Sequence, residues 1–143
     1  MTATNIPSLS ADAAIALVQA AVAEAVRQGL RIAVCACDAQ GHDLAAVRMD
    51  GVTPPILGFA RDKAYTAATM RRTTAAFAGR MGASQSLSLG LSTRPRLLPW
   101  GGGVPVVMDG QVIGGLGVSG ATDAEDVACA EAALVAFGLG WQV

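Results

Sequence analysis

The side chain best suited to chemistry in this sequence is the amine of Lys63, which stands within an alanine-rich segment. Helical spacing over residues 57–77 places Lys63 about one turn from Phe59, Ala60 and Ala67. An amine among small apolar side chains can be drawn into an apolar pocket. There it can bind a carboxylate, or act as a base at a lowered pKa. The alternative is a surface lysine whose stem lies along the protein with its ammonium in water.

Tyr65 and His42 are the other candidate catalytic residues. Tyr65, the only tyrosine, can act as a general acid or donate a hydrogen bond, or it can simply pack half-buried. His42, the only histidine, follows Gly41 at the start of an expected strand. It can serve as an acid, a base or a ligand, or it can be a solvated turn residue. No cluster of histidines and carboxylates has metal-ligand spacing, so we expect no metal centre.

Two arginines in an irregular segment are candidates for binding a substrate carboxylate or phenolate. Arg94 and Arg96 flank Pro95, and paired guanidiniums hold such groups through two parallel hydrogen bonds. The alternative is a solvated loop. Trp100 follows, as a planar wall for an aromatic ligand or as a packing anchor. The candidate substrate-binding residues are Arg94, Arg96, Trp100, Gly101, Gly102, Gly103, Ser119 and Gly120.

A glycine-rich hairpin over residues 101–121 is the strongest structural pattern in the chain. Asp109 and Gly110 separate two apolar, β-branched runs, as a tight type I′ turn requires. The second run carries glycines that weaken a strand unless another backbone or a ligand must come close. We therefore expect a cavity beside this strand, with cationic side chains from neighbouring segments supplying its polarity. These glycines are Gly114, Gly115, Gly117 and Gly120.

The end of this hairpin leads into a helix N-terminus, where free N–H groups favour a ligand anion such as a carboxylate or propionate. Ser119 and Gly120 are the residues that would meet it. The glycine spacing over residues 115–120 is only a weak dinucleotide signature, because no strand–helix–strand unit surrounds it.

The remaining elements follow from hydrophobic spacing and capping residues. A first helix begins after Ser8 or Ser10 and ends before Gly29, and a hairpin covers residues 31–49. A long helix is expected over residues 57–77, a short one over 84–91 and a last one from Thr122 or Asp123 to about residue 138. The order helix–hairpin–helices–hairpin–helix predicts a single α+β domain over residues 1–143. Its antiparallel sheet of about five strands is flanked by helices.

Composition narrows the possible partners. The hydrophobic fraction is 52% and the charged fraction only 15%, which favours subunit interfaces and hence a homo-oligomer. A net charge of −1 and 4% aromatic residues argue against nucleic-acid binding. No apolar run reaches the ~20 residues of a membrane span, and no signal peptide is expected. Three cysteines without metal or disulfide spacing indicate buried thiols in a reducing, cytoplasmic location.

Several motifs together resemble the GlcG/HbpS family, also known as DUF336 and found at the C-terminus of PduO-type proteins. They are Asp38-x-x-Gly41, Arg48-Met-Asp-Gly51, Ala60-x-x-Lys63-Ala-x-Thr66-Ala67, Gly102-Gly-x-Pro105, Gly110-x-Val-Ile-Gly-Gly-x-Gly-Val-Ser-Gly-Ala121 and Asp126-x-Ala128. The resemblance covers nearly the whole chain. It implies an antiparallel sheet flanked by helices and assembly into dimers or higher oligomers. Members include haem-binding and haem-degrading sensors, and cofactor-independent lyases such as hydroxylaminobenzoate lyase.

Three functional hypotheses remain open from the sequence. The first is a lyase or decarboxylase of aromatic catabolism, working without metal or cofactor on a small aromatic or hydroxy acid. Its substrate carboxylate would lie between the Lys63 helix and the glycine-rich hairpin. The second is a haem- or tetrapyrrole-binding protein for storage, sensing or degradation. His42 is then the solitary histidine, the other possible axial ligands are scattered apolar residues, and a ligand can also come from another subunit. The third is an accessory protein with no chemistry of its own.

Overall fold

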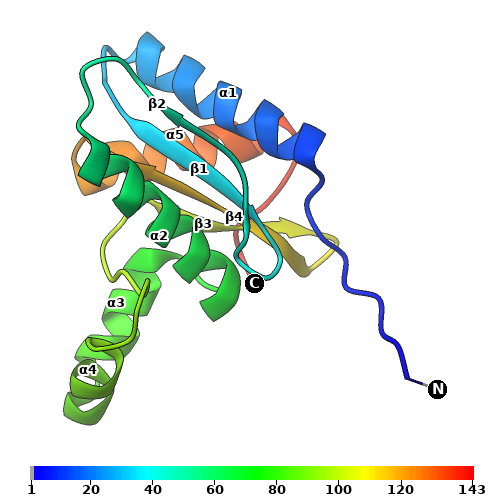
Figure 1. Cartoon of the computed structure of the whole chain (residues 1–143), viewed down its shortest axis with the longest axis vertical. Helices are drawn as coiled ribbons and strands as arrows, with labels where there is room; N and C mark the ends of the chain where they lie inside the picture. The colour runs from blue at the N-terminus through cyan, green and yellow to red at the C-terminus, as the bar shows by residue number, and fades with distance from the viewer. Residues whose placement is uncertain (1) are drawn as a thin grey trace.

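A four-stranded antiparallel sheet with the strand order β2-β1-β4-β3 forms the centre of the molecule (Figure 1). The computed structural model describes residues 2–143. The strands are β1 (Ala33–Asp38), β2 (Asp43–Arg48), β3 (Gly103–Met108) and β4 (Gln111–Ser119). The α+β class and the two hairpins are confirmed. The expectation of about five strands is wrong, because each hairpin contributes two strands and the described residues add no fifth.

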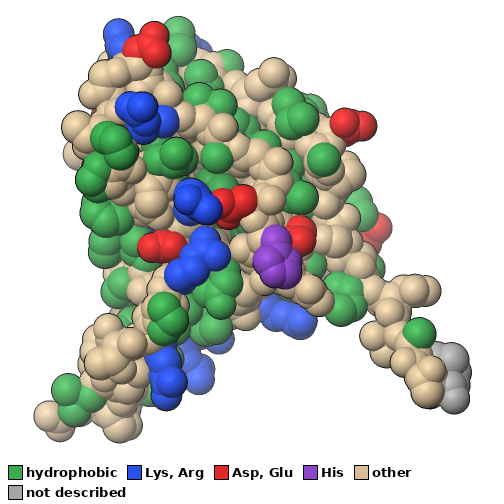
Figure 2. All heavy atoms as spheres, in the orientation of Figure 1, with side chains coloured by type: hydrophobic (Ala, Val, Ile, Leu, Met, Phe, Trp, Pro, Cys, Tyr) green, Lys and Arg blue, Asp and Glu red, His purple; other side chains and the backbone are tan. Residues whose placement is uncertain are grey.

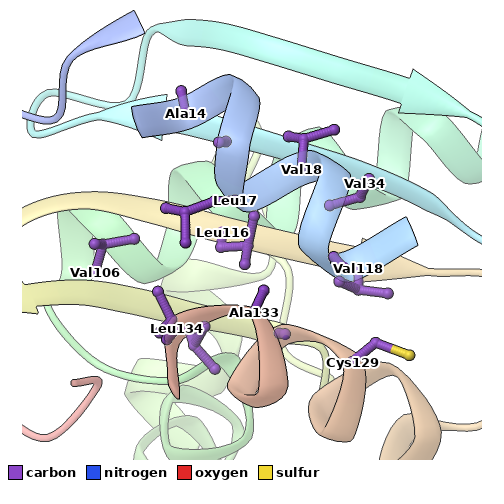
Figure 3. Close-up of a cluster of buried hydrophobic side chains, with 14 of the residues drawn as sticks. Ala14, Leu17, Val18, Val34, Val106, Leu116, Val118, Cys129, Ala133 and Leu134 are labelled. Carbon is purple, nitrogen blue, oxygen red and sulfur yellow. The ribbon is translucent and has the colours of Figure 1, made fainter. Parts of the chain in front are cut away.

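Helices cover both faces of this sheet. Helices α1 (Ala11–Arg27) and α5 (Asp123–Ala136) pack against one face, and α2 (Pro54–Met70) packs against the other (Figure 1). On the face drawn in Figure 2, apolar side chains are scattered over the surface among a small number of charged ones. The larger core lies between the sheet and α1 with α5. Figure 3 shows Leu17 and Val18 of α1 and Leu134 of α5 close to Val34 and Leu116 of the strands.

Strand β1 is buried on both faces, which explains its continuous apolar run. Cys35 and Cys37 face α2, whereas Val34 and Ala36 face the other core. Both cysteines, like Cys129 of α5, are buried free thiols, as the sequence predicts.

The expected turn and cap residues adopt the conformations that their chemistry favours. Asp109 and Gly110 both have positive φ, at 52° and 76°, so the β3–β4 connection has the backbone of a type I′ turn. The side chain of Ser10 accepts from the backbone N–H of Ala13 and begins α1. Thr122 and Glu125 form a reciprocal capping box at the start of α5.

The long helix expected over residues 57–77 is wrong in both of its bounds. Helix α2 already begins at Pro54, because proline is tolerated in a first helical turn that needs no N–H donor. It ends at Met70, where Arg71 takes a left-handed conformation with a φ of 54°. A new helix, α3 (Thr74–Gly82), then begins under the cap of Thr73. A further short helix, α4 (Gln85–Leu91), follows.

The glycines of the β3–β4 hairpin let α2 approach the sheet at backbone distance. A Cβ atom on Gly117 would collide with the carbonyl oxygen of Ala60, and one on Gly115 with that of Ala64. A Cβ on Gly103 would lie 2.5 Å from the carbonyl oxygen of Lys63. The bare strand surface is therefore filled by another backbone. The expectation of a ligand cavity over these glycines is wrong, because a whole helix occupies that space.

None of the helices formed by residues 2–143 is both long enough and apolar enough to cross a membrane.

We expect Gly117→Ala to lower the free energy of unfolding by at least about 2 kcal/mol, because the added methyl group must push α2 away from β4. The measurement is urea denaturation followed by circular dichroism. The control is Gly58→Ala on α2, where an added Cβ meets nothing within 4 Å. This control should raise stability by about 0.5–1 kcal/mol, as alanine does in a helix interior. Equal effects from the two variants would contradict the close α2–β4 packing.

Candidate functional site

Lys63 is fully buried and joins three elements of the fold. Its Nζ donates to the backbone oxygen of Val118 on β4 at 2.8 Å and to Oδ2 of Asp126 on α5 at 3.2 Å. It is the only lysine of the chain. A Cβ on Gly102 would lie 2.6 Å from this Nζ, so that glycine is needed to leave room for the ammonium. The side chain thus connects α2 with α5 past the end of the sheet.

Asp126 is the partner that makes this burial possible. Its side chain is 2% exposed, and Oδ1 accepts from the backbone N–H of Ala121 at 3.0 Å. Each carboxylate oxygen therefore has a donor. No buried side-chain nitrogen or oxygen within residues 2–143 lacks a hydrogen-bond partner. The buried charges are compensated as a low-dielectric interior requires.

Burial works against both charges of this pair. It lowers the pKa of Lys63 below its ordinary value of 10.5, and the attraction of Asp126 opposes that shift. It raises the pKa of Asp126 above 3.8, against the attraction of Lys63 and the hydrogen bond from Ala121. Desolvation is the larger effect on each group, so burial disfavours the charged form of both side chains.

The ring of Trp100 lies near the ammonium and is itself in contact with a second ring. Nζ of Lys63 is 5.9 Å from the centroid of Trp100, which meets Phe59 edge to face at 5.5 Å. Trp100 is 39% and Phe59 37% exposed, so they form a surface cover beside the buried amine. The structure therefore brings together three of the predicted site residues, Lys63, Trp100 and Gly102. It leaves no surface of Lys63 open to a substrate.

A second cluster of charged groups lies on the surface, over α2 and the segment after α4. Nε of Arg61 donates to Oδ2 of Asp43 at 2.6 Å, and Nε of Arg96 donates to Oδ1 of Asp62 at 3.0 Å. The Arg96 guanidinium stacks 4.3 Å from the ring centroid of Tyr65. The predicted residues Arg96 and Tyr65 are thus together, but in a group that does not include Lys63. An open hollow of about 310 Å³ lies beside Arg61 and Arg96.

His42 lies at the turn between β1 and β2, with its side chain 75% exposed. Nδ1 is 3.4 Å from Oδ2 of Asp38. Burial of Asp38 would raise its pKa, but hydrogen bonds from the backbone N–H groups of His42 and Gln40 hold that pKa below its ordinary 3.8. Asp38 is therefore a fixed anion beside the imidazole. Figure 2 shows the histidine on the surface, next to a cluster of basic and acidic side chains.

The other predicted residues lie apart from one another. Arg94 is exposed and Ser119 is buried. Gly120 has a φ of 123° and packs on the backbone of residue 31. A Cβ on Gly101 would contact the side chain of Asp123. Near the start of α5, the N–H groups of Ala121, Thr122 and Glu125 donate to side chains of the chain itself, so these three are not free for an anion.

Sequence reasoning missed the carboxylates that organise these groups. Asp126 partners Lys63, Asp38 partners His42, and Asp62 partners Arg96. Two of the three had a signal, since Asp38 and Asp126 both stand in the motifs that carry the family resemblance. Asp62 had none.

The three thiols are poor ligands at neutral pH. Burial raises the pKa of Cys37 to about 12 and that of Cys129 to about 11, and it raises the pKa of Cys35 as well. All three are therefore protonated thiols, and the thiolate is the form that binds metals. Within residues 2–143, no three His, Cys, Asp or Glu side chains are grouped to hold a metal ion.

We expect Lys63→Met and Asp126→Asn each to lower the free energy of unfolding by about 3 kcal/mol, because each leaves one buried charge without its partner. The double variant should lose less than the sum of the two, since neither charge then remains. Urea denaturation of the four proteins at one pH measures this coupling. Strictly additive losses would contradict a direct interaction between the two side chains.

The Asp126→Asn variant should also become more stable as the pH rises toward 10.5, the ordinary pKa of lysine. Burial keeps the pKa of Lys63 below 10.5 in the folded protein, so the unfolded chain binds more protons between the two values. Stability then increases with pH in that window. The Lys63→Met/Asp126→Asn variant is the control and should lack this increase. A rise of equal size in both variants would assign it to other groups.

Comparison with known proteins places these features in a family. Residues 9–135 match the family model described as "Haem degrading protein HbpS-like". The GlcG protein of Escherichia coli K12 is 38% identical over 111 residues, which is 78% of this chain and 81% of GlcG. The crystal structure of HbpS has a TM-score of 0.87 and 31% identity, covering 95% of this chain and 94% of HbpS.

A third relative corrects the expectation of a site that needs no cofactor. A crystal structure described as a PduOC:heme complex has a TM-score of 0.86 and 28% identity, covering 95% of this chain and 99% of that one. A protein of the same fold thus carries haem, which contradicts the interpretation without cofactor. The matched residues, the GlcG identity and the agreement of the folds together show that this chain belongs to the HbpS-like family.

Proposed function

We propose that this protein binds haem, with the imidazole of His42 as an axial ligand to the iron. The likeness to a PduOC:heme complex and to HbpS supports a tetrapyrrole ligand. The observation that carries the choice of ligand is the contact between Nδ1 of His42 and Oδ2 of Asp38 at 3.4 Å. A carboxylate that accepts from one ring nitrogen fixes the tautomer and makes the other nitrogen a better metal ligand.

The imidazole of His42 and the thioether of Met108 are exposed donors, and the imidazole has the carboxylate of Asp38 beside it. Haem iron takes histidine, cysteinate, methionine or tyrosine as its axial ligand. The three thiols are buried and protonated. Tyr65 lies under the guanidinium of Arg96. His42 is exposed, and its Nε2 has no partner among residues 2–143.

The surroundings of His42 suit the two halves of a haem molecule. Asp38, the partner of His42, lines a hollow of about 280 Å³ together with Ile6, Ser8, Ala39 and Gln40, of which Ile6 and Ala39 offer apolar contact to the porphyrin. Asp43 follows His42 in the chain and pairs with Arg61 and Arg96. These guanidiniums are suited to the propionate carboxylates, as paired arginines generally are. Haem itself would supply the redox chemistry of the iron.

The lyase interpretation draws less support from the geometry. It needs a substrate carboxylate at Lys63, and the ammonium already has Asp126 and the carbonyl of Val118 as partners, with no exposed surface. Haem binding requires only groups that lie on the surface.

We expect haemin titration to give a shifted Soret band with wild-type protein, and His42→Ala to weaken haem binding at least about tenfold, because the axial bond to iron is lost. Asp38→Asn should have a smaller effect in the same direction, since it removes the carboxylate behind the imidazole. Met108→Leu is the matched control, because Met108 is 46% exposed and offers the other accessible donor atom.

A further variant separates ligation from loss of structure. His42→Gly should regain the wild-type Soret band when free imidazole is added, since the imidazole can occupy the vacated position. A wild-type spectrum and affinity in His42→Ala, or a loss caused by Met108→Leu instead, would overturn His42 as the ligand. No Soret shift with wild-type protein would overturn the proposed function.

A further inference from the structure

A hollow of about 270 Å³ lies where the end of α2 meets the short helices α3 and α4, which project from the body of the molecule (Figure 1). Its apolar lining comes from all three helices. Met70 ends α2, Phe77 belongs to α3, and Leu87 and Leu91 belong to α4. Phe77 is almost fully buried, and the two leucines are half-buried. We call this recess the α3–α4 hollow, and its concave apolar wall is of the kind that holds small ligands.

Two arginines give the α3–α4 hollow a cationic side. Arg72 and Arg80 both line it, and neither has a carboxylate within 4.0 Å among residues 2–143. Nε of Arg72 donates to the backbone oxygen of Met70 at 3.3 Å, which leaves its terminal N–H groups for another acceptor. Arg80 is exposed in the last turn of α3. Guanidiniums with free N–H groups bind carboxylates through parallel hydrogen bonds.

The charge of the surrounding segment also favours an anion. Residues 64–108 contain five arginines and no acidic residue, whereas the rest of the chain holds all 11 acidic residues. Of these arginines, Arg96 alone is paired with carboxylates of residues 2–143, those of Asp62 and Asp43. A concentration of uncompensated positive charge raises the local concentration of anionic ligands. The net charge of −1 thus conceals a cationic region around the hollow.

Helix α4 lacks cover on the side that faces the hollow. It has seven residues, none of them buried, and among the described helices and strands it packs only against α3. So short a helix is marginal in water unless its apolar face is covered. Leu87 and Leu91 are four residues apart and so share the face that lines the hollow. A ligand with an apolar body supplies the missing cover.

We propose that the α3–α4 hollow binds a small amphipathic carboxylate, a monocarboxylic acid with an apolar chain of about eight carbon atoms. Its carboxylate meets Arg72 and Arg80, and its chain lies over Phe77, Leu87 and Leu91. A longer acid exceeds the volume, because each water-sized group takes about 30 Å³. The hollow shares no lining residue with those beside Asp38 and Arg61, so this site is additional to the haem site proposed above.

The test is a titration of the full chain with sodium octanoate, followed by amide chemical shifts in NMR spectra. We expect saturable shifts in residues 69–91 with a dissociation constant of about 1 mM or below. Octanol and inorganic phosphate should each bind at least about tenfold more weakly, since octanol lacks the charge and phosphate lacks the apolar body. Octanoate should also slow amide hydrogen exchange in α4, because the covered helix opens less often.

Paired variants separate the two halves of the hollow. Arg80→Gln should weaken octanoate binding about tenfold, because a charge-assisted hydrogen bond is lost. Its control is Arg71→Gln, which removes the same charge from an exposed arginine outside the hollow and should change binding less than about twofold. Leu87→Ser should also weaken binding about tenfold, whereas Leu89→Ser should not, since Leu89 is 65% exposed and does not line the hollow. Circular dichroism checks that all four variants remain folded.

Four results would overturn the proposal. The first is the absence of saturable shifts up to about 10 mM octanoate. The second is an equal loss of binding in Arg71→Gln and Arg80→Gln, which would reduce the effect to net charge. The third is displacement of octanoate by an equimolar amount of haemin, which would make the hollow part of the haem site. The fourth is binding to phosphatidylglycerol vesicles without binding of octanoate, which would assign the cationic region to a lipid surface.

Discussion

The approach of α2 to β4 at backbone distance is the constraint from which the other features of this structure follow. Side chains on Gly103, Gly115 and Gly117 would collide with the backbone of α2, so these positions have no Cβ. A helix seated this close to a sheet leaves no space for solvent along its inner face. Lys63 stands on that face, and its ammonium is therefore enclosed. Asp126 on α5 then becomes necessary, because an unpaired buried ammonium is costly.

This arrangement separates the buried ion pair of Lys63 and Asp126 from the charged groups on the surface. The strongest cation–anion pair holds α2, β4 and α5 together and has no access to ligands. The groups that can meet a ligand lie on the surface, at the β1–β2 turn and over the outer side of α2. There His42 is backed by Asp38, and Arg61 and Arg96 are held by carboxylates. Helices α3 and α4 form a third region, where Leu89 is 65% exposed.

Much of the fold could be predicted from the sequence because its signals are local. Asp109 and Gly110 specify a hairpin, and Thr122 with Glu125 specifies a helix start. The break at Arg71 could not be predicted, because an arginine in a left-handed conformation carries no signal in an alanine- and threonine-rich run. The same limit applied to the site. The glycines of β4 indicated a close approach, but only the tertiary structure shows that α2 makes it. The partner of Lys63 lies 63 residues away on another helix.

The enclosure of Lys63 can be measured directly, because it is the only lysine of the chain. The measurement is the rate at which acetic anhydride acetylates Lys63, followed by mass spectrometry of the native protein and of a sample in denaturant. We expect native acetylation to be at least about a hundredfold slower than in denaturant, since the amine reacts only when α2 detaches from β4. Acetylation of native Lys63 at the rate of the denatured chain would show that its amine is not enclosed between α2 and β4.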